Sequence, residues 1–200
     1  MSRVLGVHLC WGAYGFWLPN DPRGSGSEFV WSEDLREFGA ATTVLDRSRS
    51  VARKSHDRRT RLAAKKVLSR PAVQFTGIQA RAVGRGFEWF ATEYELTVWA
   101  CAILPEHVHL VVGPHHVHAH DLDRRLKAAG AAALNAEELH PFRHMPKPDG
   151  SLPKCWQRGC WAKFLFDEGA VRREIRYVEE NPLKEGKPRQ RWPFVTEYLA

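Results

Sequence analysis

Several features that define large classes of protein are absent from this sequence. It contains no run of about 18 apolar residues, the length that a membrane-spanning helix needs, and no basic-then-apolar segment of the kind that directs secretion. Four cysteines in 200 residues are too few for a disulfide scaffold and favour a reducing compartment. We therefore expect a soluble, cytoplasmic protein with no membrane partner.

The sequence does contain an excess of positive charge. Thirty Lys and Arg residues oppose 23 Asp and Glu, which leaves a formal net charge of +7. This balance favours an anionic partner, because neutralised phosphates release condensed counterions. Charge alone does not show whether the partner is nucleic acid or an acidic surface. A basic protein that has no anionic partner would carry the same charge. The eight tryptophans fit either a core or a platform on which bases stack.

The hydrophobic pattern predicts an α+β domain. Strand-like and helix-like segments follow in the order β, α, β, β, α, β, α, which is typical of a ferredoxin-like or RRM-like antiparallel sheet with helices on one face. The other face would then be free to hold a site. The last helix should stop before Asn181 and Pro182, since proline cannot continue the helical hydrogen bonds. The expected strands are 4–11, 96–104, 107–112 and 161–166, and the expected helices are 72–93, 121–139 and 168–180.

The N-terminal third differs in character from this pattern. We expect one domain over residues 1–200 that contains a basic helical insertion at about 35–70. Residues 46–70 hold ten Lys or Arg against two Asp, so this helix is expected to be exposed, as a solvated face or as a DNA contact. The preceding loop, AYGFWLPNDPRGSGS, has the composition of consecutive turns and enough aromatic residues to be structured.

Two histidines stand out on the third expected strand. His107 and His109 are separated by one residue, so both side chains project from the same face of the strand. Two imidazoles placed in this way can share one metal ion. Alternatively, they are two unrelated histidines on an exposed strand face.

A tyrosine on the last expected helix is the second notable feature. Tyr177 is followed by Glu180 and Asn181 at the i+3 and i+4 positions, so the three side chains project to roughly one side. A phenol and a possible metal ligand are thus close together. The alternative is a half-buried tyrosine that serves only in packing.

Three segments together resemble a known family. ILPEHVHLVV, RYVEENPLKEG and YGFWLPNDPRG are similar to motifs of the one-tyrosine HUH transposases, and the nearest group is the one associated with repetitive extragenic palindromes. The likeness covers most of the chain in motif order, except the basic segment 46–70. It implies the HUH endonuclease fold and a nucleoid-associated protein of bacterial type that takes part in transposition and DNA recombination.

The resemblance also implies a divalent metal site. Its ligands would be His107, His109 and a polar residue one turn after the tyrosine, which is Asn181 here. Relatives often have glutamine at that place, so Glu180 is the alternative third ligand, and His8 on the first strand is a further ligand or a supporting residue. The ion would be Mn²⁺ or Mg²⁺, and imidazole ligands favour Mn²⁺.

The implied chemistry is cleavage of single-stranded or hairpin DNA through a covalent intermediate. Tyr177 would attack phosphorus in line and form a 5′-phosphotyrosine, with release of a 3′-hydroxyl. A free phenol has a pKa of about 10, so Tyr177 needs help from Lys184, Arg176 or the metal to lose its proton. Either a monomer or a homodimer is compatible with one tyrosine per chain.

Several exposed residues are expected to contact DNA. An ordinary solvated charge is the alternative for each basic residue, and a role in pinning a loop is the alternative for each tryptophan. The expected contacts are Arg23 and Trp17 in the N-terminal loop, and Lys184, Lys187, Arg189, Arg191 and Trp192 after the tyrosine.

Two other functions are also compatible with the sequence. The chain could be a DNA-binding protein derived from a transposase that has lost catalysis, since sequence similarity survives loss of activity. It could also be a zinc-stabilised nucleic-acid-binding module, because Cys155 and Cys160 follow His140 and His144 at distances that resemble a zinc site.

Overall fold

The structure is a computed structural model that describes residues 3–25, 27–44 and 54–199. The chain divides into two compact units, residues 1–13 with 74–200, and residues 14–73. We call them the sheet unit and the loop unit, and each is described by itself. The elements of the sheet unit are β1 (Gly6–Gly12), α3 (Gly77–Glu93), β2 (Val98–Ile103), β3 (His107–Val112), α4 (Ala119–Ala136), β4 (Trp161–Leu165) and α5 (Glu168–Lys184).

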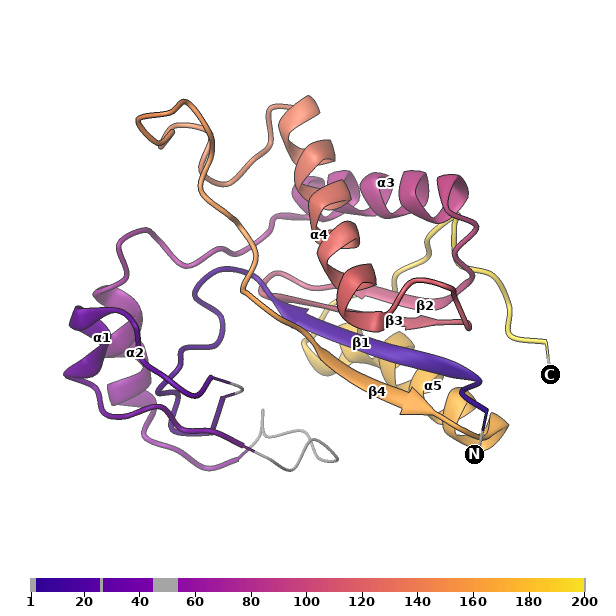
Figure 1. Cartoon of the computed structure of the whole chain (residues 1–200), viewed down its shortest axis with the longest axis horizontal. Helices are drawn as coiled ribbons and strands as arrows, with labels where there is room; N and C mark the ends of the chain where they lie inside the picture. The colour runs from indigo at the N-terminus through magenta and orange to yellow at the C-terminus, as the bar shows by residue number, and fades with distance from the viewer. Residues whose placement is uncertain (1–2, 26, 45–53, 200) are drawn as a thin grey trace. The chain divides into compact units, whose positions relative to one another are not determined.

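The sheet unit is built on one antiparallel sheet. Its four strands lie in the order β2-β3-β1-β4, so the two central strands, β3 and β1, come from segments far apart in the sequence (Figure 1). Leu9 pairs with Leu110, and Cys10 pairs with His109, which defines the register of the central pair. The predicted α+β fold, an antiparallel sheet with helices packed on it, is confirmed.

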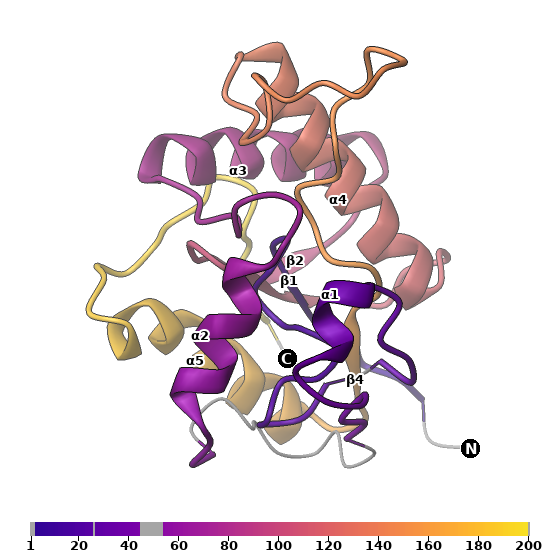
Figure 2. The ribbon, with the colours of Figure 1, turned by 90° about the vertical axis from the view of Figure 1, so that its left-hand side faces the viewer.

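Helices cover both faces of this sheet. On one face Trp11 of β1 meets Phe87 of α3 with ring centroids 5.9 Å apart, and α4 packs against α3 on the same side (Figures 1 and 2). On the other face Val111 packs with Val171 and Val178 of α5. The expectation that this second face lies open is therefore wrong. Polar groups on it lie between a sheet and a helix, where water has limited access.

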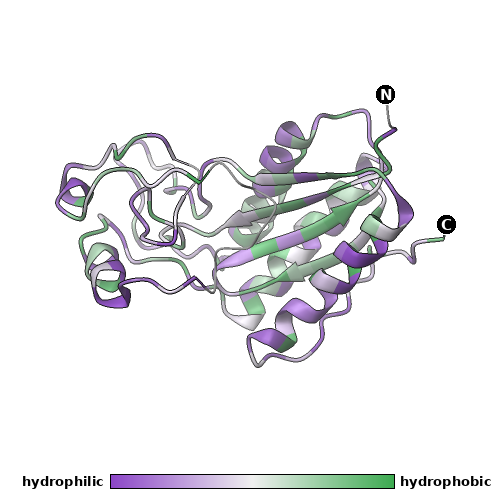
Figure 3. Ribbon diagram, turned by 90° about the horizontal axis from the view of Figure 1, so that it is seen from below, coloured by the Kyte–Doolittle hydropathy of each residue, from purple (hydrophilic) through white to green (hydrophobic). Residues whose placement is uncertain are grey.

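The hydropathy of the strands reflects this double cover. Seen from below, the strands carry mainly hydrophobic residues interrupted by hydrophilic ones (Figure 3). The buried strand pattern extends to both faces, since Leu9, Leu110 and Val111 are all fully buried. Within the described residues, no helix is long and apolar enough to cross a membrane.

Two helix boundaries differ by more than one turn from those expected. α3 begins at Gly77 rather than at residue 72, because Thr76 caps it: the Thr76 hydroxyl accepts from the Gln79 amide and the Gln79 side chain accepts from the Thr76 amide. α5 continues through Asn181 and Pro182 to Lys184. Proline removes one helical hydrogen bond, but both residues are buried, so their packing holds the last turn in place.

The loop unit contains two short helices, α1 (Glu33–Arg36) and α2 (Arg58–Lys66). Leu18, Leu35 and Ala64 form its small apolar core, and the Asn20 side chain donates to the Leu35 carbonyl at 2.6 Å. The N-terminal loop is therefore structured, as expected. The helix expected across residues 46–70 is shorter, because Asp57 caps α2 and residues 54–57 are not helical. Residues 45–53 of that segment lie outside the described residues.

Candidate active site

The two histidines of β3 are positioned by a tight turn. Leu104 and His107 close the β2–β3 hairpin through a 2.8 Å hydrogen bond around Pro105 and Glu106. The backbone carbonyls of Pro105 and Glu106 accept from the amides of Phe75 and Ala13, which hold the turn from two sides. The rings of His107 and His109 lie side by side with centroids 5.0 Å apart. Their predicted proximity on one strand face is present in the structure.

Helix α5 and Glu185, the residue that caps its C-terminal end, present one line of side chains to these histidines. The Tyr177 ring lies 5.6 Å from the His109 ring, and Glu185 Oε1 lies 3.6 Å from His107 Nε2. Asn181 stands four residues after Tyr177 and four before Glu185, so it occupies the same helix face between them. It is 7% exposed, and its buried Nδ2 has no hydrogen-bond partner within the described part of the chain.

The two alternatives for a third ligand are thus placed differently. Asn181 is buried on the side of α5 that faces the sheet, whereas Glu180 is partly exposed and forms an ion pair with Lys184 at 3.5 Å. A third ligand must lie on the side of α5 that faces the two histidines, and an amide oxygen such as Asn181 Oδ1 is able to bind a cation. The geometry favours Asn181 over Glu180.

The protonation states of the histidines suit metal binding. Burial lowers the pKa of His107 to about 4, although the nearby Glu106 carboxylate opposes this shift. Burial, together with the charges of His107, His8 and Lys184, holds the pKa of His109 well below its usual value. Both imidazoles are therefore neutral at pH 7, the form that binds metals. Among the described residues, no three His, Cys, Asp or Glu side chains are grouped as ligands, so the amide of Asn181 would have to complete a site with the two histidines.

A hydrogen-bonded network supports the histidines from β1 and β4. His8 Nε2 lies 3.0 Å from His109 Nδ1, and His8 Nδ1 lies 2.7 Å from Glu174 Oε2. Lys163 Nζ donates to the other oxygen of Glu174 at 2.7 Å. Burial alone would raise the pKa of Glu174, but its hydrogen bonds with His8 and Lys163 lower it to about 2.

Some of these residues were missed by the analysis of the sequence. Glu174 precedes Tyr177 by three residues on α5, so the helical spacing was a signal that could have revealed it. Lys163 and Cys10 gave no local signal, because only the sheet register places Lys163 beside His8 and Cys10 beside His109. The Cys10 Sγ lies 3.8 Å from His109 Nε2, and burial, with the proximity of Cys160, raises its pKa to about 12.

One of the suggested basic residues lies against the tyrosine. The Lys184 ammonium is 4.7 Å from the centre of the Tyr177 ring, whereas Arg176 points to solvent from an exposed position. A cation over the face of a phenol is attracted by the ring and also stabilises negative charge that develops on its oxygen. Lys184 is therefore the better placed of the two to assist Tyr177.

The basic residues after α5 are held near the histidine hairpin. Gln190 accepts from the Ile103 amide and donates to the Ile103 carbonyl, each at 2.8 Å, at the end of β2 that leads into the turn before His107. Lys187, Arg189 and Arg191 flank this anchor. Arg189 and Arg191 are exposed, so they remain candidates for phosphate contacts.

The two residues of the N-terminal loop that were expected to contact DNA have partners within that loop. Arg23 is only 6% exposed, and its guanidinium binds both carboxylate oxygens of Asp21 while it lies 4.0 Å from the centre of the Trp17 ring. The Trp17 Nε1 donates to the Gly24 carbonyl. Both side chains therefore stabilise the loop that contains them, and the buried, paired Arg23 is not available to a phosphate in this structure. Trp192 likewise packs on Gly84 of α3 and pins the C-terminal segment.

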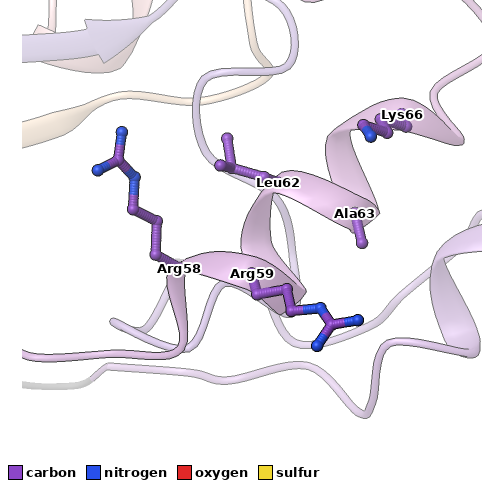
Figure 4. Close-up of a pocket in the computed structure, with 5 residues that line it drawn as sticks. All are labelled: Arg58, Arg59, Leu62, Ala63 and Lys66. Carbon is purple, nitrogen blue, oxygen red and sulfur yellow. The ribbon is translucent and has the colours of Figure 1, made fainter.

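The loop unit has a basic hollow of its own on α2. Arg58, Arg59, Leu62, Ala63 and Lys66 line it, and its volume is about 570 Å³ (Figure 4). The two arginines extend away from each other rather than toward one point (Figure 4). All five residues belong to one helix surface, which fits a solvated basic face as well as a nucleic-acid contact.

The residues of the suggested zinc site are not brought together. Cys160 Sγ contacts His120 Nδ1 at 3.8 Å, and the His140 Nδ1 accepts from the Phe142 amide. His144 forms a hydrogen bond with Arg143. Within the described residues, no three His, Cys, Asp or Glu side chains are grouped as potential zinc ligands.

Comparison with known proteins gives a limited result. No family model matches the chain, and no curated protein matches it. It is similar to the solved structure of a REP-associated tyrosine transposase bound to a REP hairpin, with 14% identity, 97% of this chain and 78% of that chain covered, and a TM-score of 0.49. It is also similar to a crystal structure from Deinococcus radiodurans R1 described as a candidate transposase, with 16% identity, 90% and 92% covered, and a TM-score of 0.37.

Both similar structures are described as transposases, the class that the sequence motifs resemble. The identities are too low to transfer a role to any single residue.

Proposed function

We propose that this chain is a metal-dependent endonuclease and strand transferase for single-stranded or hairpin DNA, with Tyr177 as its nucleophile. The observation that supports this most directly is the convergence of unlike chemical groups. The Tyr177 ring lies 5.6 Å from the His109 ring, which lies 5.0 Å from the His107 ring. A phenol, two neutral imidazoles and a buried amide on adjoining elements form a nucleophile beside a set of metal ligands.

The reaction exchanges one phosphodiester for another. The Tyr177 phenol oxygen bonds to phosphorus as the bond to the 3′-oxygen breaks, and the phenol proton is passed on so that the 3′-oxygen leaves as a hydroxyl. The products are a 5′-phosphotyrosine and a free 3′-hydroxyl. Since no bond energy is lost to water, the reverse step can join a new 3′-hydroxyl to the held strand.

The surroundings of Tyr177 fit this role. Lys184, 4.7 Å from the ring centre, stabilises negative charge on the phenol oxygen as the proton leaves. The partly buried ring packs against the core cluster of α5, which holds it in one place for attack in line. A divalent ion held by His107, His109 and Asn181 would supply positive charge to the non-bridging oxygens of the scissile phosphate.

The proposed substrate follows from the charge and the motifs. The chain has a formal net charge of +7, and the exposed Arg189 and Arg191 adjoin the end of the sheet where the histidine hairpin turns. Basic side chains of this kind bind the phosphate backbone. A flexible single strand can bring a scissile phosphate to a tyrosine that lies between a helix and a sheet, whereas a rigid duplex cannot.

The test is the covalent product itself. The protein is incubated with Mn²⁺ and labelled single-stranded hairpin oligonucleotides, and adducts are separated on denaturing gels. We expect an adduct with the wild type and none with Tyr177→Phe. Tyr198→Phe is the matched control, since Tyr198 packs against Trp99 in the same core cluster and has no part in the proposed reaction.

The other results are equally informative. An adduct that persists in Tyr177→Phe would exclude this tyrosine as the nucleophile. Tight, salt-sensitive DNA binding without any adduct would replace the enzyme with a binding protein that has lost catalysis.

A further inference from the structure

A chain of hydrogen bonds runs from a carboxylate to one of the proposed metal ligands. Glu174 Oε2 lies 2.7 Å from His8 Nδ1, and His8 Nε2 lies 3.0 Å from His109 Nδ1. His8 is 1% exposed and His109 is 6% exposed, so water does not compete for these bonds. The three side chains come from α5, β1 and β3, which meet only in the folded protein.

The direction of the hydrogen bonds follows from the ionised carboxylate. An ionised Glu174 can only accept, so His8 Nδ1 must donate and carry a proton. Lys163 donates to the other carboxylate oxygen of Glu174 at 2.7 Å, so Glu174 is held from two sides. The other nitrogen of His8, Nε2, faces His109 Nδ1, and as an acceptor it requires the proton of that bond on His109 Nδ1.

The remaining nitrogen of His109, Nε2, faces a thiol. His109 Nε2 points toward the Cys10 Sγ at 3.8 Å, and a thiol is a weak donor that suits an acceptor at this place. The edge of Trp161 lies against the His8 ring with centroids 5.1 Å apart, which keeps His8 from turning. The contacts on both sides of the His109 ring thus fit one tautomer, the form protonated at Nδ1.

We infer that Glu174 and His8 are positioning residues that hold His109 in its Nδ1-protonated form, so that Nε2 is available to bind a divalent cation. The inference deepens the proposed function and rests on it for the identity of the ligand. Metal-binding histidines commonly donate their second nitrogen to a partner that sets their orientation and basicity. Here that partner is itself a histidine, oriented by a carboxylate.

The first test reads the tautomer directly and needs no metal. Nitrogen-15 NMR of the metal-free protein at pH 7.5, with labelled histidine, distinguishes a protonated Nδ1 from a protonated Nε2. The His109 signals are assigned from their absence in His109→Gln. We expect His109 to be protonated at Nδ1 in the wild type, and to lose this preference in His8→Ala.

The second test measures Mn²⁺ affinity by calorimetry. Removing a partner of this kind weakens metal binding about 10-fold to 100-fold, so we expect that range for His8→Ala and for Glu174→Ala. Asp123→Asn is the control, because Asp123 forms a buried ion pair with Lys127 on α4. It should lower stability without changing Mn²⁺ affinity, and circular dichroism verifies that every variant is folded.

The outcomes separate this inference from the proposed function. A wild-type His109 protonated at Nε2 overturns the inference whatever the enzyme does, and so does unchanged Mn²⁺ affinity in both His8→Ala and Glu174→Ala. The latter result leaves the proposed function intact if the adduct still forms. An Nδ1-protonated His109 that depends on His8, in a protein that forms no adduct, supports the positioning network and overturns the proposed function alone.

Discussion

The two faces of the same four strands contain very different side chains. On the face covered by α3 and α4, β1 and β3 place Leu9, Trp11 and Leu110, which are 0–3% exposed. On the face covered by α5, the same two strands place His8 and His109, which are almost as deeply buried. Neighbouring positions along each strand thus alternate between an apolar core and a polar site.

The difference shows how a buried polar site is maintained. A buried polar group without a partner costs about 1–3 kcal/mol, so a face of histidines would weaken the fold if they were left alone. His8, His109, Glu174 and Lys163 instead satisfy one another through hydrogen bonds. The apolar face supplies stability, and the polar face is preserved by its own network.

The largest expected effect comes from a substitution that disrupts the polar face alone. His107→Ala should abolish adduct formation even at saturating Mn²⁺, because it removes one of two imidazole ligands. Its effect on the free energy of unfolding should be smaller than that of a core substitution. Denaturing gels and urea unfolding measure the two quantities. His116→Ala, at an exposed loop position, is the control. Unchanged cleavage by His107→Ala would refute the metal site.

The next largest effect comes from a substitution that disrupts the apolar face alone. Leu110 is fully buried, so Leu110→Ala should lower the free energy of unfolding by about 2–5 kcal/mol through lost burial and a cavity. Adduct formation per folded molecule should stay close to that of the wild type. Urea denaturation gives the stability, and Ile78→Ala, at a position 55% exposed, should change it by less than about 0.5 kcal/mol. Equal effects would mean that Leu110 lies outside the stabilising core.

A pH titration sharpens the contrast between the two faces. Unfolded histidine takes up a proton below about pH 6.5, whereas burial lowers the pKa of folded His107 to about 4. Between these values the unfolded state binds more protons, so the free energy of unfolding should fall by about 1–3 kcal/mol as the pH drops from 6.5 to 4. Stability measured against pH should be flatter in His107→Gln. An equally steep profile in that variant would assign the dependence to other groups.

The smallest effect concerns the exposed rim of the site. If Arg189 contacts a phosphate, Arg189→Ala should lower the salt dependence of single-strand binding by about 0.7 in the slope of log K against log salt. Fluorescence anisotropy at several salt concentrations measures this slope. Arg124→Ala is the control, since Arg124 is exposed on α4 and pairs with Asp121. An identical slope in the wild type and both variants would exclude Arg189 from the DNA contact.

Local patterns sufficed for much of the fold. The alternation in HVHLVV predicted a strand at 107–112, and the structure has β3 over the same residues. The local pattern was less informative where tertiary contacts of side chains override the local preference of the backbone. Pro182 suggested a helix that ends at residue 180, but buried contacts carry α5 to Lys184. Arg23 was expected to contact phosphate, but in the structure its guanidinium binds the Asp21 carboxylate.

The sequence by itself determined the periodicity that puts His107 and His109 on one strand face and Tyr177 and Asn181 on one helix face, because these patterns follow from backbone geometry within a single element. Only the tertiary structure decided that the two faces meet, that α5 covers the histidines, that Glu174 reaches His8, and that Lys163 pairs with His8 in the sheet. Those contacts join segments that lie more than 60 residues apart in the chain. Tertiary packing and the register of the sheet select them, rather than local propensity.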